Sequence, residues 1–324
     1  MTTRAIVKGV GHYLPERVVE NAEFEKSLDT TDEWIRTRTG ISRRHFAKDG
    51  QTTSDLAMRA GRAALADADL QPDQIDALIL ATSTADYTFP STATVVQAAL
   101  GMTSGYAFDV QAVCAGFVYA MANANALIIS GQAKRVLVIG AETFSRILDF
   151  DDRATCVLFG DGAGAVVLEA ANGNGTSDDR GILSVDLNSD GSYRDLLYVD
   201  GGVSTTGTVG VLKMQGPELF KHAVVKLAQT ARTSLSSAGL TDADLDWIVP
   251  HQANIRIISG TAKKLGLSMD QVIVTVQDHG NTSAASIPLA LSTGKALGKF
   301  EPGNLLLLEA IGGGLAWGSV VLRW

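Results

Sequence analysis

An internal repeat is the feature of this 324-residue sequence that most constrains its fold. Three pairs of segments align in the same order along the chain: residues 70–79 with 240–249, 135–141 with 304–310, and 164–168 with 318–322. The offsets of 170, 169 and 154 residues are nearly constant and then fall by 15, as expected if the second copy lacks a loop. Buried strands of similar composition can also match by coincidence, but three matches in one order favour a duplicated unit.

Each copy is predicted to be an α/β unit. The apolar runs 136–139 and 247–249 have the length of strands, and each follows a long stretch with the composition or spacing of a helix. This alternation indicates helices layered on a sheet whose strands are buried. The two halves, residues 1–172 and 173–324, are predicted to meet in the turn-rich Asn-Gly segment near residue 172.

Composition argues against several classes of function. The chain is 46% hydrophobic and 19% charged, which is typical of a globular protein, and its net charge of −8 disfavours binding to nucleic acid. Two cysteines cannot form a disulfide framework, and no histidine or cysteine set has the spacing of a metal site. No stretch approaches the roughly twenty apolar residues of a transmembrane helix, and no apolar leader is visible. We therefore expect a cytoplasmic protein with no membrane partner.

Cys114 lies where an apolar, strand-like stretch gives way to an alanine-rich stretch of helical composition. At the start of a helix, the dipole and the free N–H groups favour a thiolate, so this cysteine is a candidate nucleophile. A buried structural role is the more frequent fate of a single cysteine and remains the alternative. Cys156, inside the apolar run 154–159, is predicted to belong to the core.

His251 and Asn281 lie at two further junctions between a predicted strand and helix. Sites in α/β sheets gather at the ends of strands, although a single histidine there is often structural. Cysteine, histidine and asparagine together form a recurrent grouping for acyl transfer through a thiol. Cys114 and Asn281 are 167 residues apart, close to the repeat offset, so they are expected to occupy equivalent junctions that face each other.

The motifs around these residues resemble the β-ketoacyl-acyl-carrier-protein synthase III family. They are Ala-Val-Cys-Ala-Gly-Phe at 112–117, Val-Pro-His-Gln-Ala-Asn at 249–254, His-Gly-Asn-Thr-Ser-Ala-Ala-Ser at 279–286, Gly312–Gly314 before Trp317, and the segments 32–35 and 38–41. The likeness runs from about residue 5 to Trp324. It implies the thiolase-like fold, a duplicated αβαβα arrangement in five layers, and a homodimer.

The resemblance also implies the chemistry. Cys114 is expected to take an acyl group from acyl-CoA, most simply acetyl-CoA, and to pass it to malonyl-acyl carrier protein with loss of CO2. His251 and Asn281 are expected to hold the malonyl thioester and to stabilise the enolate. The backbone N–H groups of Cys114 and Gly314 are expected to form the oxyanion hole of the acyl step. No metal and no organic cofactor are implied.

Further roles follow from the same resemblance. The residues expected to bind CoA are Thr30, Trp34, Arg38, Arg153 and Asn254, with Trp34 and Arg153 on either side of the adenine. Phe89, from the partner subunit, and Ile311 are expected to shape the acyl pocket. The residues expected to meet the carrier protein are Lys221, Arg256, Lys263 and Lys264. From the residues alone, Trp34 would be a helix anchor, and Lys263 and Lys264 could equally compensate a helix dipole.

Four alternatives are weighed against this interpretation. A thiolase needs a second cysteine as base, and Cys156 stands in the wrong context. An elongating synthase uses a second histidine where this chain has Asn281. An ester-forming acyltransferase or a condensing enzyme of secondary metabolism keeps the cysteine and the histidine, and the sequence disfavours it less. A catalytically silent carrier-binding protein would not need the complete set of three residues.

Overall fold

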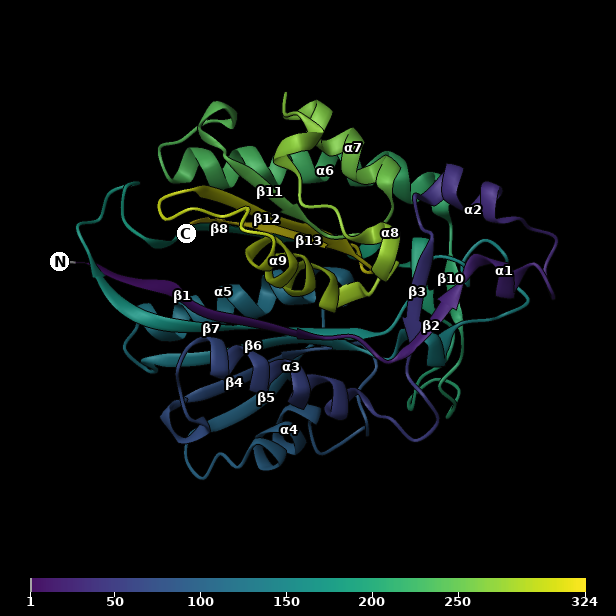
Figure 1. Cartoon of the computed structure of the whole chain (residues 1–324), viewed down its shortest axis with the longest axis horizontal. Coiled ribbons are helices and arrows are strands. Elements are labelled where there is room, and N and C mark those ends of the chain that lie inside the picture. Colours follow the sequence, from purple (N-terminus) through teal and green to yellow (C-terminus); the bar gives the residue numbers. More distant parts are fainter. Residues whose placement is uncertain (1) are drawn as a thin grey trace.

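The computed structural model describes residues 2–324 and contains two main sheets (Figure 1). The first sheet has five strands in the order β1-β7-β6-β4-β5. Their bounds are β1 Thr2–Tyr13, β4 Ala77–Ala81, β5 Tyr106–Val110, β6 Arg135–Glu142 and β7 Gly162–Gly173. β4 runs parallel to β5 and β6, whereas β7 is antiparallel to both β6 and β1.

The second sheet repeats this arrangement. Its order is β11-β12-β13-β8, with β8 Gly181–Ser189, β11 Trp247–Pro250, β12 Leu305–Gly312 and β13 Ala316–Arg323. β11 and β12 are parallel, β13 is antiparallel to β12 and β8, and Val272 extends the sheet beyond β11 through a parallel bridge to Ile248. Each pair of aligned sequence segments therefore contributes strands to matching positions of the two sheets. The proposed division after residue 172 falls at the end of β7 and stays a prediction.

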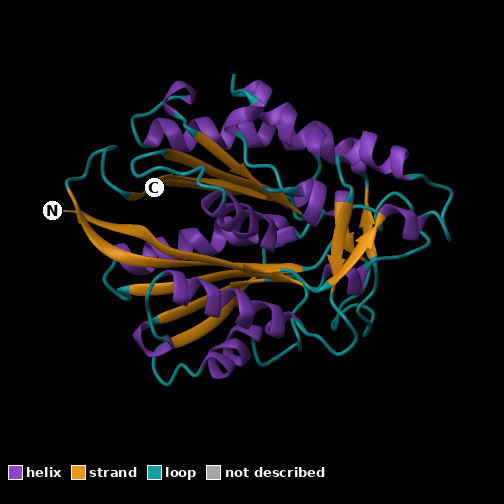
Figure 2. Cartoon of the chain, in the orientation of Figure 1, coloured by secondary structure: helices purple, strands orange, loops and turns teal. Residues whose placement is uncertain are grey.

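Helices complete five layers, which Figure 2 shows as alternating helix and strand layers. α5 (Gly116–Ile129) and α9 (Ser286–Ala296) lie between the sheets and contact both of them. α3 (Thr53–Asp67) and α4 (Thr92–Leu100) cover the outer face of the first sheet, and α6 (Gly216–Ser237) and α7 (Ile255–Lys264) that of the second. Because α5 is enclosed on both sides, it carries no charged residue and buries Phe117 and Met121 completely.

A smaller unit covers one end of these layers and supplies one wall of the site. It comprises β2 Arg17–Glu20, α1 Asn21–Phe24, α2 Asp32–Thr39, β3 Arg43–Phe46, β9 Leu197–Val199, β10 Leu212–Met214 and α8 Val276–His279. The fully buried guanidinium of Arg44 donates to Val19 O, Asn21 Oδ1 and Val157 O at 3.2, 2.8 and 2.7 Å. These bonds tie the unit to the segment that precedes β7.

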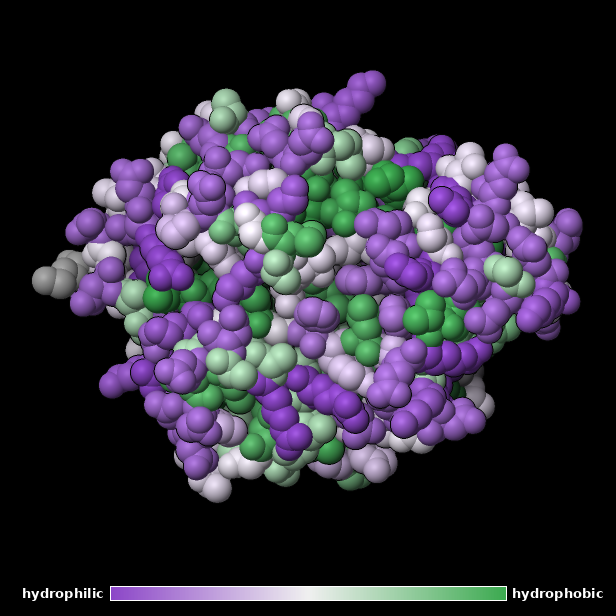
Figure 3. Space-filling view, viewed as in Figure 1, coloured by the Kyte–Doolittle hydropathy of each residue, from purple (hydrophilic) through white to green (hydrophobic). Residues whose placement is uncertain are grey.

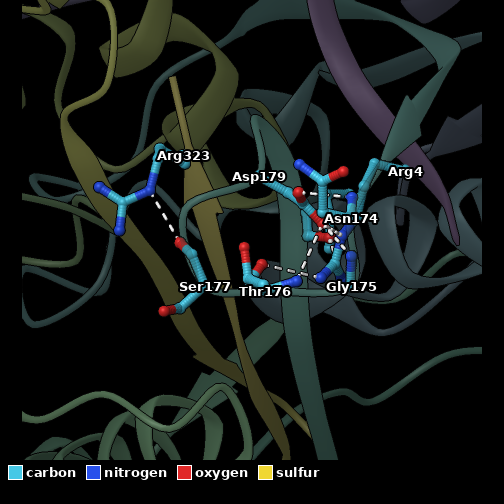
Figure 4. A network of polar contacts seen from close by, with 8 residues as sticks. Arg4, Asn174, Gly175, Thr176, Ser177, Asp179 and Arg323 are labelled. Atoms are coloured by element: carbon cyan, nitrogen blue, oxygen red, sulfur yellow. Dashed lines mark hydrogen bonds and ion pairs between the residues drawn. The ribbon is translucent and has the colours of Figure 1, made fainter. Parts of the chain in front are cut away.

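The connection between the two halves is held by a polar network (Figure 4). The Asp179 carboxylate accepts the backbone N–H groups of residues 174–176 and the Nε–H of Arg4 in β1. Arg323 in β13 donates to Ser177 O at 2.8 Å, so both sheets are tied to this loop.

The molecular face in Figure 3 is mostly hydrophilic, with small separate apolar patches. Across residues 2–324, no helix is long and apolar enough to cross a membrane.

Candidate active site

Cys114 stands in a strained turn between β5 and α5. The 3₁₀ turn Val113–Ala115 leads directly into α5, so the thiol lies at the start of a buried helix. Val113 has φ +48°, which is rare for a β-branched residue and costs on the order of 1–3 kcal/mol. Burial, with a smaller contribution from the Glu142 carboxylate, raises the pKa of the Cys114 thiol to about 12. The thiol is therefore protonated at neutral pH.

Asn281 lies beside a second turn of the same kind. The 3₁₀ turn Ser283–Ala285 leads into α9, and Ser283 also has φ +48°. Asn281 Oδ1 accepts the Ser283 N–H at 2.9 Å, and its backbone N–H donates to Leu158 O at 2.8 Å. Val113 and Ser283 are 170 residues apart, so the two strained turns are equivalent positions of the duplicated unit.

His251 follows β11, and its ring is fixed by α9. Its backbone N–H donates to Glu309 O at 2.8 Å, and Nδ1 lies 2.7 Å from Ser286 Oγ. Ser286 Oγ also accepts the Gln252 N–H at 3.3 Å, so its own proton is free to point to Nδ1, which leaves Nε2–H as a donor. Burial lowers the His251 pKa to about 3, so the imidazole is neutral at physiological pH.

One pocket of about 630 Å³ brings the three residues together. Cys114, His251 and Asn281 all line it. Six more of the predicted residues line the same pocket: Trp34, Arg38, Lys221, Asn254, Arg256 and Ile311. The pocket runs between α2, the start of α6, the start of α7 and the two strained turns. A long substrate can therefore extend from α2 at the surface to the buried thiol.

Trp34 and Arg38 lie at one wall of this pocket, and Arg153, which does not line it, also packs on the Trp34 ring. The guanidinium carbons of Arg38 and Arg153 lie 4.7 and 4.8 Å from its ring centroid. Arg153 also donates to the backbone carbonyl of Asp29, in the loop before α2. Thr30 belongs to that loop, but does not line the pocket. Asn254 caps α7 by accepting the N–H groups of residues 256 and 257 at 3.0 Å, so its amide NH2 is left to face a ligand.

The glycine triplet packs directly against the nucleophile. A Cβ on Gly312 would lie 2.7 Å from Cys114 N, and one on Gly313 would lie 2.8 Å from Leu197 O. Both positions therefore require glycine, since any side chain would push the loop away from Cys114. Gly314 ends this loop and precedes Leu315. The loop packs against the Cys114 backbone N–H at Gly312.

Three further predicted residues lie away from the pocket, namely Phe89, Lys263 and Lys264. Phe89 is 82% exposed, in the loop before α4. Lys263 and Lys264 are exposed in the last turn of α7 and do not line the pocket. Lys221 and Arg256 are at the pocket rim, where Lys221 pairs with Glu218 at 2.6 Å. Across residues 2–324, no group of histidine, cysteine and carboxylate side chains could hold a metal ion.

Comparison with known proteins shows the family of this chain. Residues 108–191 match the family model of 3-oxoacyl-[acyl-carrier-protein] synthase III, and residues 235–324 match the model of its C-terminal part. The β-ketoacyl-[acyl-carrier-protein] synthase III of Ruegeria pomeroyi is 76% identical over the full length of both chains, and that of Roseobacter denitrificans is 71% identical. The chain belongs to the β-ketoacyl-acyl-carrier-protein synthase III family.

Solved structures of synthase III enzymes confirm the predicted thiolase-like fold. The enzyme from Aquifex aeolicus superposes with a TM-score of 0.93 at 46% identity and covers 99% of this chain and 100% of its own. The enzyme from Pseudomonas aeruginosa gives 0.93 at 44% identity, covering 99% and 98%. A priming β-ketosynthase of the R1128 polyketide pathway also matches, at 0.91 and 36% identity, covering 99% and 96%.

Two polar residues of this synthase III site were missing from the sequence prediction. Glu142, at the end of β6, is fully buried and accepts Thr84 Oγ1–H at 2.6 Å and the Ser83 N–H at 3.1 Å. Burial raises the pKa of its carboxyl to about 7, and the Ser283 hydroxyl lies beside both Glu142 and Cys114. In the sequence, the signal for Glu142 was its position as a single carboxylate directly after the apolar run 136–141. Ser286, the partner of His251, gave none, because only tertiary packing joins them.

Proposed function

We propose that this member of the family condenses an acyl-CoA primer with malonyl-acyl carrier protein and so initiates type II fatty-acid synthesis. The products are a 3-oxoacyl carrier protein, CO2 and CoA. The observation that carries this proposal is the meeting of Cys114, His251 and Asn281 in one pocket that extends to Trp34 and Arg38. We expect the reaction to take place in the cytoplasm and to need neither a metal nor an organic cofactor.

In the first half-reaction, Cys114 Sγ attacks the carbonyl carbon of acyl-CoA. The bond to the CoA sulfur breaks, and the thiol proton ends on the departing CoA thiol, so the step is balanced. Negative charge forms on the carbonyl oxygen, where the N–H groups of Cys114 and Gly314 would donate to it. Each such donor contributes about 3 kcal/mol in comparable sites. Trp34, Arg38, Arg153 and Thr30 would hold the nucleotide end, and Asn254 the pantetheine arm.

In the second half-reaction, the malonyl thioester takes the place of CoA. Loss of CO2 leaves an enolate whose oxygen accepts from His251 Nε2–H and the Asn281 amide. Both donors suit this role because the imidazole is neutral and the amide does not titrate. The enolate carbon then attacks the acyl carbon on Cys114, and the carbon–sulfur bond breaks to give the product and the Cys114 thiolate, which takes up one proton from water to regenerate the thiol.

The proposed carrier protein would dock beside the pocket. Carrier proteins are strongly acidic as a rule, and Lys221 and Arg256 lie at the pocket rim while Lys263 and Lys264 stand exposed further along α7. Charge complementarity of this kind speeds association. Because exposed charges are screened, we expect the affinity for the carrier to fall as ionic strength rises.

Intact-mass spectrometry tests the function. The protein is mixed with acetyl-CoA and then with malonyl-acyl carrier protein, and Cys114→Ala is treated in the same way. We expect wild type alone to gain one acetyl group and then to release it as acetoacetyl carrier protein. An adduct only from longer acyl-CoAs would move the function to a specialised condensing enzyme or acyltransferase of secondary metabolism. No adduct from any donor would refute acyl transfer through Cys114.

A further inference from the structure

A lysine held between two aromatic rings lies behind the acyl side of the pocket. Lys226 in α6 follows the pocket residue Ala223 by one helical turn. Its Nζ lies 3.8 Å from the ring centroid of Trp317 in β13 and 5.1 Å from that of Tyr193. Both distances are within the range of a cation–π interaction. Tyr193 belongs to the 3₁₀ turn Gly191–Leu196 and also packs against His222, with ring centroids 4.5 Å apart and the ring planes tilted by 51°.

The two aromatic residues belong to segments that are already paired next to the glycine triplet. Asp190 N donates to Leu315 O at 2.8 Å, and Leu315 N donates to Asp190 O at 3.0 Å. Trp317 follows Leu315 by two residues, and Tyr193 follows Asp190 by three. Lys226 therefore links the Tyr193 segment to the Trp317 segment, which are also joined by the backbone pair of Asp190 and Leu315. Leu315 directly follows Gly314.

The other side of the glycine loop 312–314 contacts the segment that carries Tyr193. Gly313 is confined between Leu197 O and the Val113 side chain, where an added Cβ would lie 2.8 and 3.4 Å from them. Leu197 directly follows the turn that carries Tyr193. The position of that turn thus sets how closely residues 312–314 approach Cys114. A turn that moved outward would carry the Gly314 N–H away from the acyl carbonyl.

Lys226 has no carboxylate as a direct partner. Among residues 2–324, it forms no ion pair within 4.0 Å, and its charge faces the two rings. The charge also helps to lower the pKa of Asp190, after the larger effect of the Ser192 hydroxyl. Because no buried carboxylate depends on it, Lys226 can be replaced without leaving an unpaired charge behind.

We propose that Lys226 is a positioning residue that fixes the oxyanion loop Gly312–Gly314 through Trp317 and Tyr193. This inference rests on the proposed function, because it assigns the Gly314 N–H to the acyl step. It adds a residue of α6 that touches no substrate to the machinery for acyl transfer. The cation acts through two aromatic faces, so arginine can replace it and an uncharged chain of similar length cannot.

The test compares Lys226→Met with Lys226→Arg in single-turnover acylation by acetyl-CoA, followed by intact mass. We expect the methionine variant to acylate about tenfold more slowly, less than the roughly hundredfold loss when an oxyanion donor is removed outright. The KM for acetyl-CoA should change little, and the arginine variant should stay close to wild type. Lys299→Met is the matched control, since Lys299 lies over the distant Trp247 ring at 5.5 Å.

Alkylation of Cys114 by iodoacetamide separates positioning from general damage, because it uses no oxyanion hole. We expect Lys226→Met to be alkylated at the wild-type rate. Wild-type acylation in Lys226→Met, or equal losses of acylation and alkylation, would overturn the inference. If the methionine variant does not fold, Tyr193→Leu removes the other ring and must give the same selective loss. A wild-type protein that takes no acyl group would instead refute the proposed function, and the inference with it.

Discussion

Glu142 gives the nucleophile a titratable neighbour inside the protein. Its carboxyl is fully buried, and its charge contributes to the raised pKa of Cys114. We expect Glu142→Gln to lower the Cys114 pKa, because a like charge nearby is removed. The amide oxygen of glutamine can still accept from Ser83 and Thr84. The measurement is the rate of iodoacetamide alkylation against pH, which should rise at pH 8. An unchanged profile would mean that the two groups are not coupled.

Ser286 sets the tautomer of His251. Without its hydroxyl, the neutral imidazole is free to carry the proton on Nδ1 and to lose the Nε2–H donor. We expect Ser286→Ala to slow malonyl decarboxylation about tenfold and to leave acylation of Cys114 unchanged. The matched control is Ser292→Ala on the same helix, whose hydroxyl lies 2.7 Å from His12 Nδ1. Equal decarboxylation rates in the two variants would contradict the role of Ser286.

Individual residues were predictable where the chain itself marks them. Cys114, His251 and Asn281 each stand in a local motif, and the pocket joins them. The predicted junction after a strand is correct for Cys114 and His251, but Asn281 follows the short helix α8 instead of a strand. Lys226 carries no such mark, and the motif 279–286 that ends in Ser286 does not mark it as the partner of His251. Lys226 is an ordinary polar position of an amphipathic helix until β13 and the turn Gly191–Leu196 pack around it. Residues that act through other residues become visible only in the folded chain.

At the scale of elements, Asp179 holds the connection between β7 and β8 (Figure 4). The backbone N–H of Asn174 and the other donors, including Arg4, lower the pKa of its carboxyl to about 2 from the usual 3.8. A pKa that is lower in the folded protein stabilises it above pH 3.8, and this contribution disappears as the pH falls to about 2. We expect Asp179→Asn to lower the melting temperature at pH 7, with the difference shrinking below pH 4.

The control for Asp179→Asn is Asp178→Asn, which removes the same charge from an exposed neighbour. Thermal melts of both variants against wild type should show a loss only in Asp179→Asn. Equal melting temperatures at pH 7 would show that the network adds nothing to stability.

The sequence predicted a turn near residue 172 but not this network, because Arg4 and Arg323 come from opposite ends of the chain. The short elements α1, β2 and β3 likewise gave too little periodicity to be predicted.

At the scale of the whole molecule, the repeat was the strongest guide from the sequence. It predicted two α/β units of one design, and the four strands of the second sheet follow the order of β4, β6, β7 and β1 in the five-stranded first sheet. It could not predict that α5 and α9 would be shared between the sheets, since both helices are apolar on nearly all sides and only packing decides their neighbours. The pocket depends on that packing, because Cys114 lies in the turn that begins α5 and Asn281 lies just before the turn that begins α9.

The free edge of the first sheet predicts the quaternary structure. β5 ends the sheet order, and the exposed aromatic residues Tyr87, Phe89 and Tyr106 belong to it or to the loop beside it. An exposed strand edge with apolar side chains favours pairing with a second copy. Because Phe89 is 82% exposed and outside its own pocket, it is free to reach that of a partner subunit.

We expect Phe89→Asp to shift the protein from dimer to monomer in light scattering and to slow acylation by acetyl-CoA. Leu297→Asp, at another exposed apolar position, should remain a dimer. A dimeric Phe89→Asp protein with wild-type activity would place the interface elsewhere.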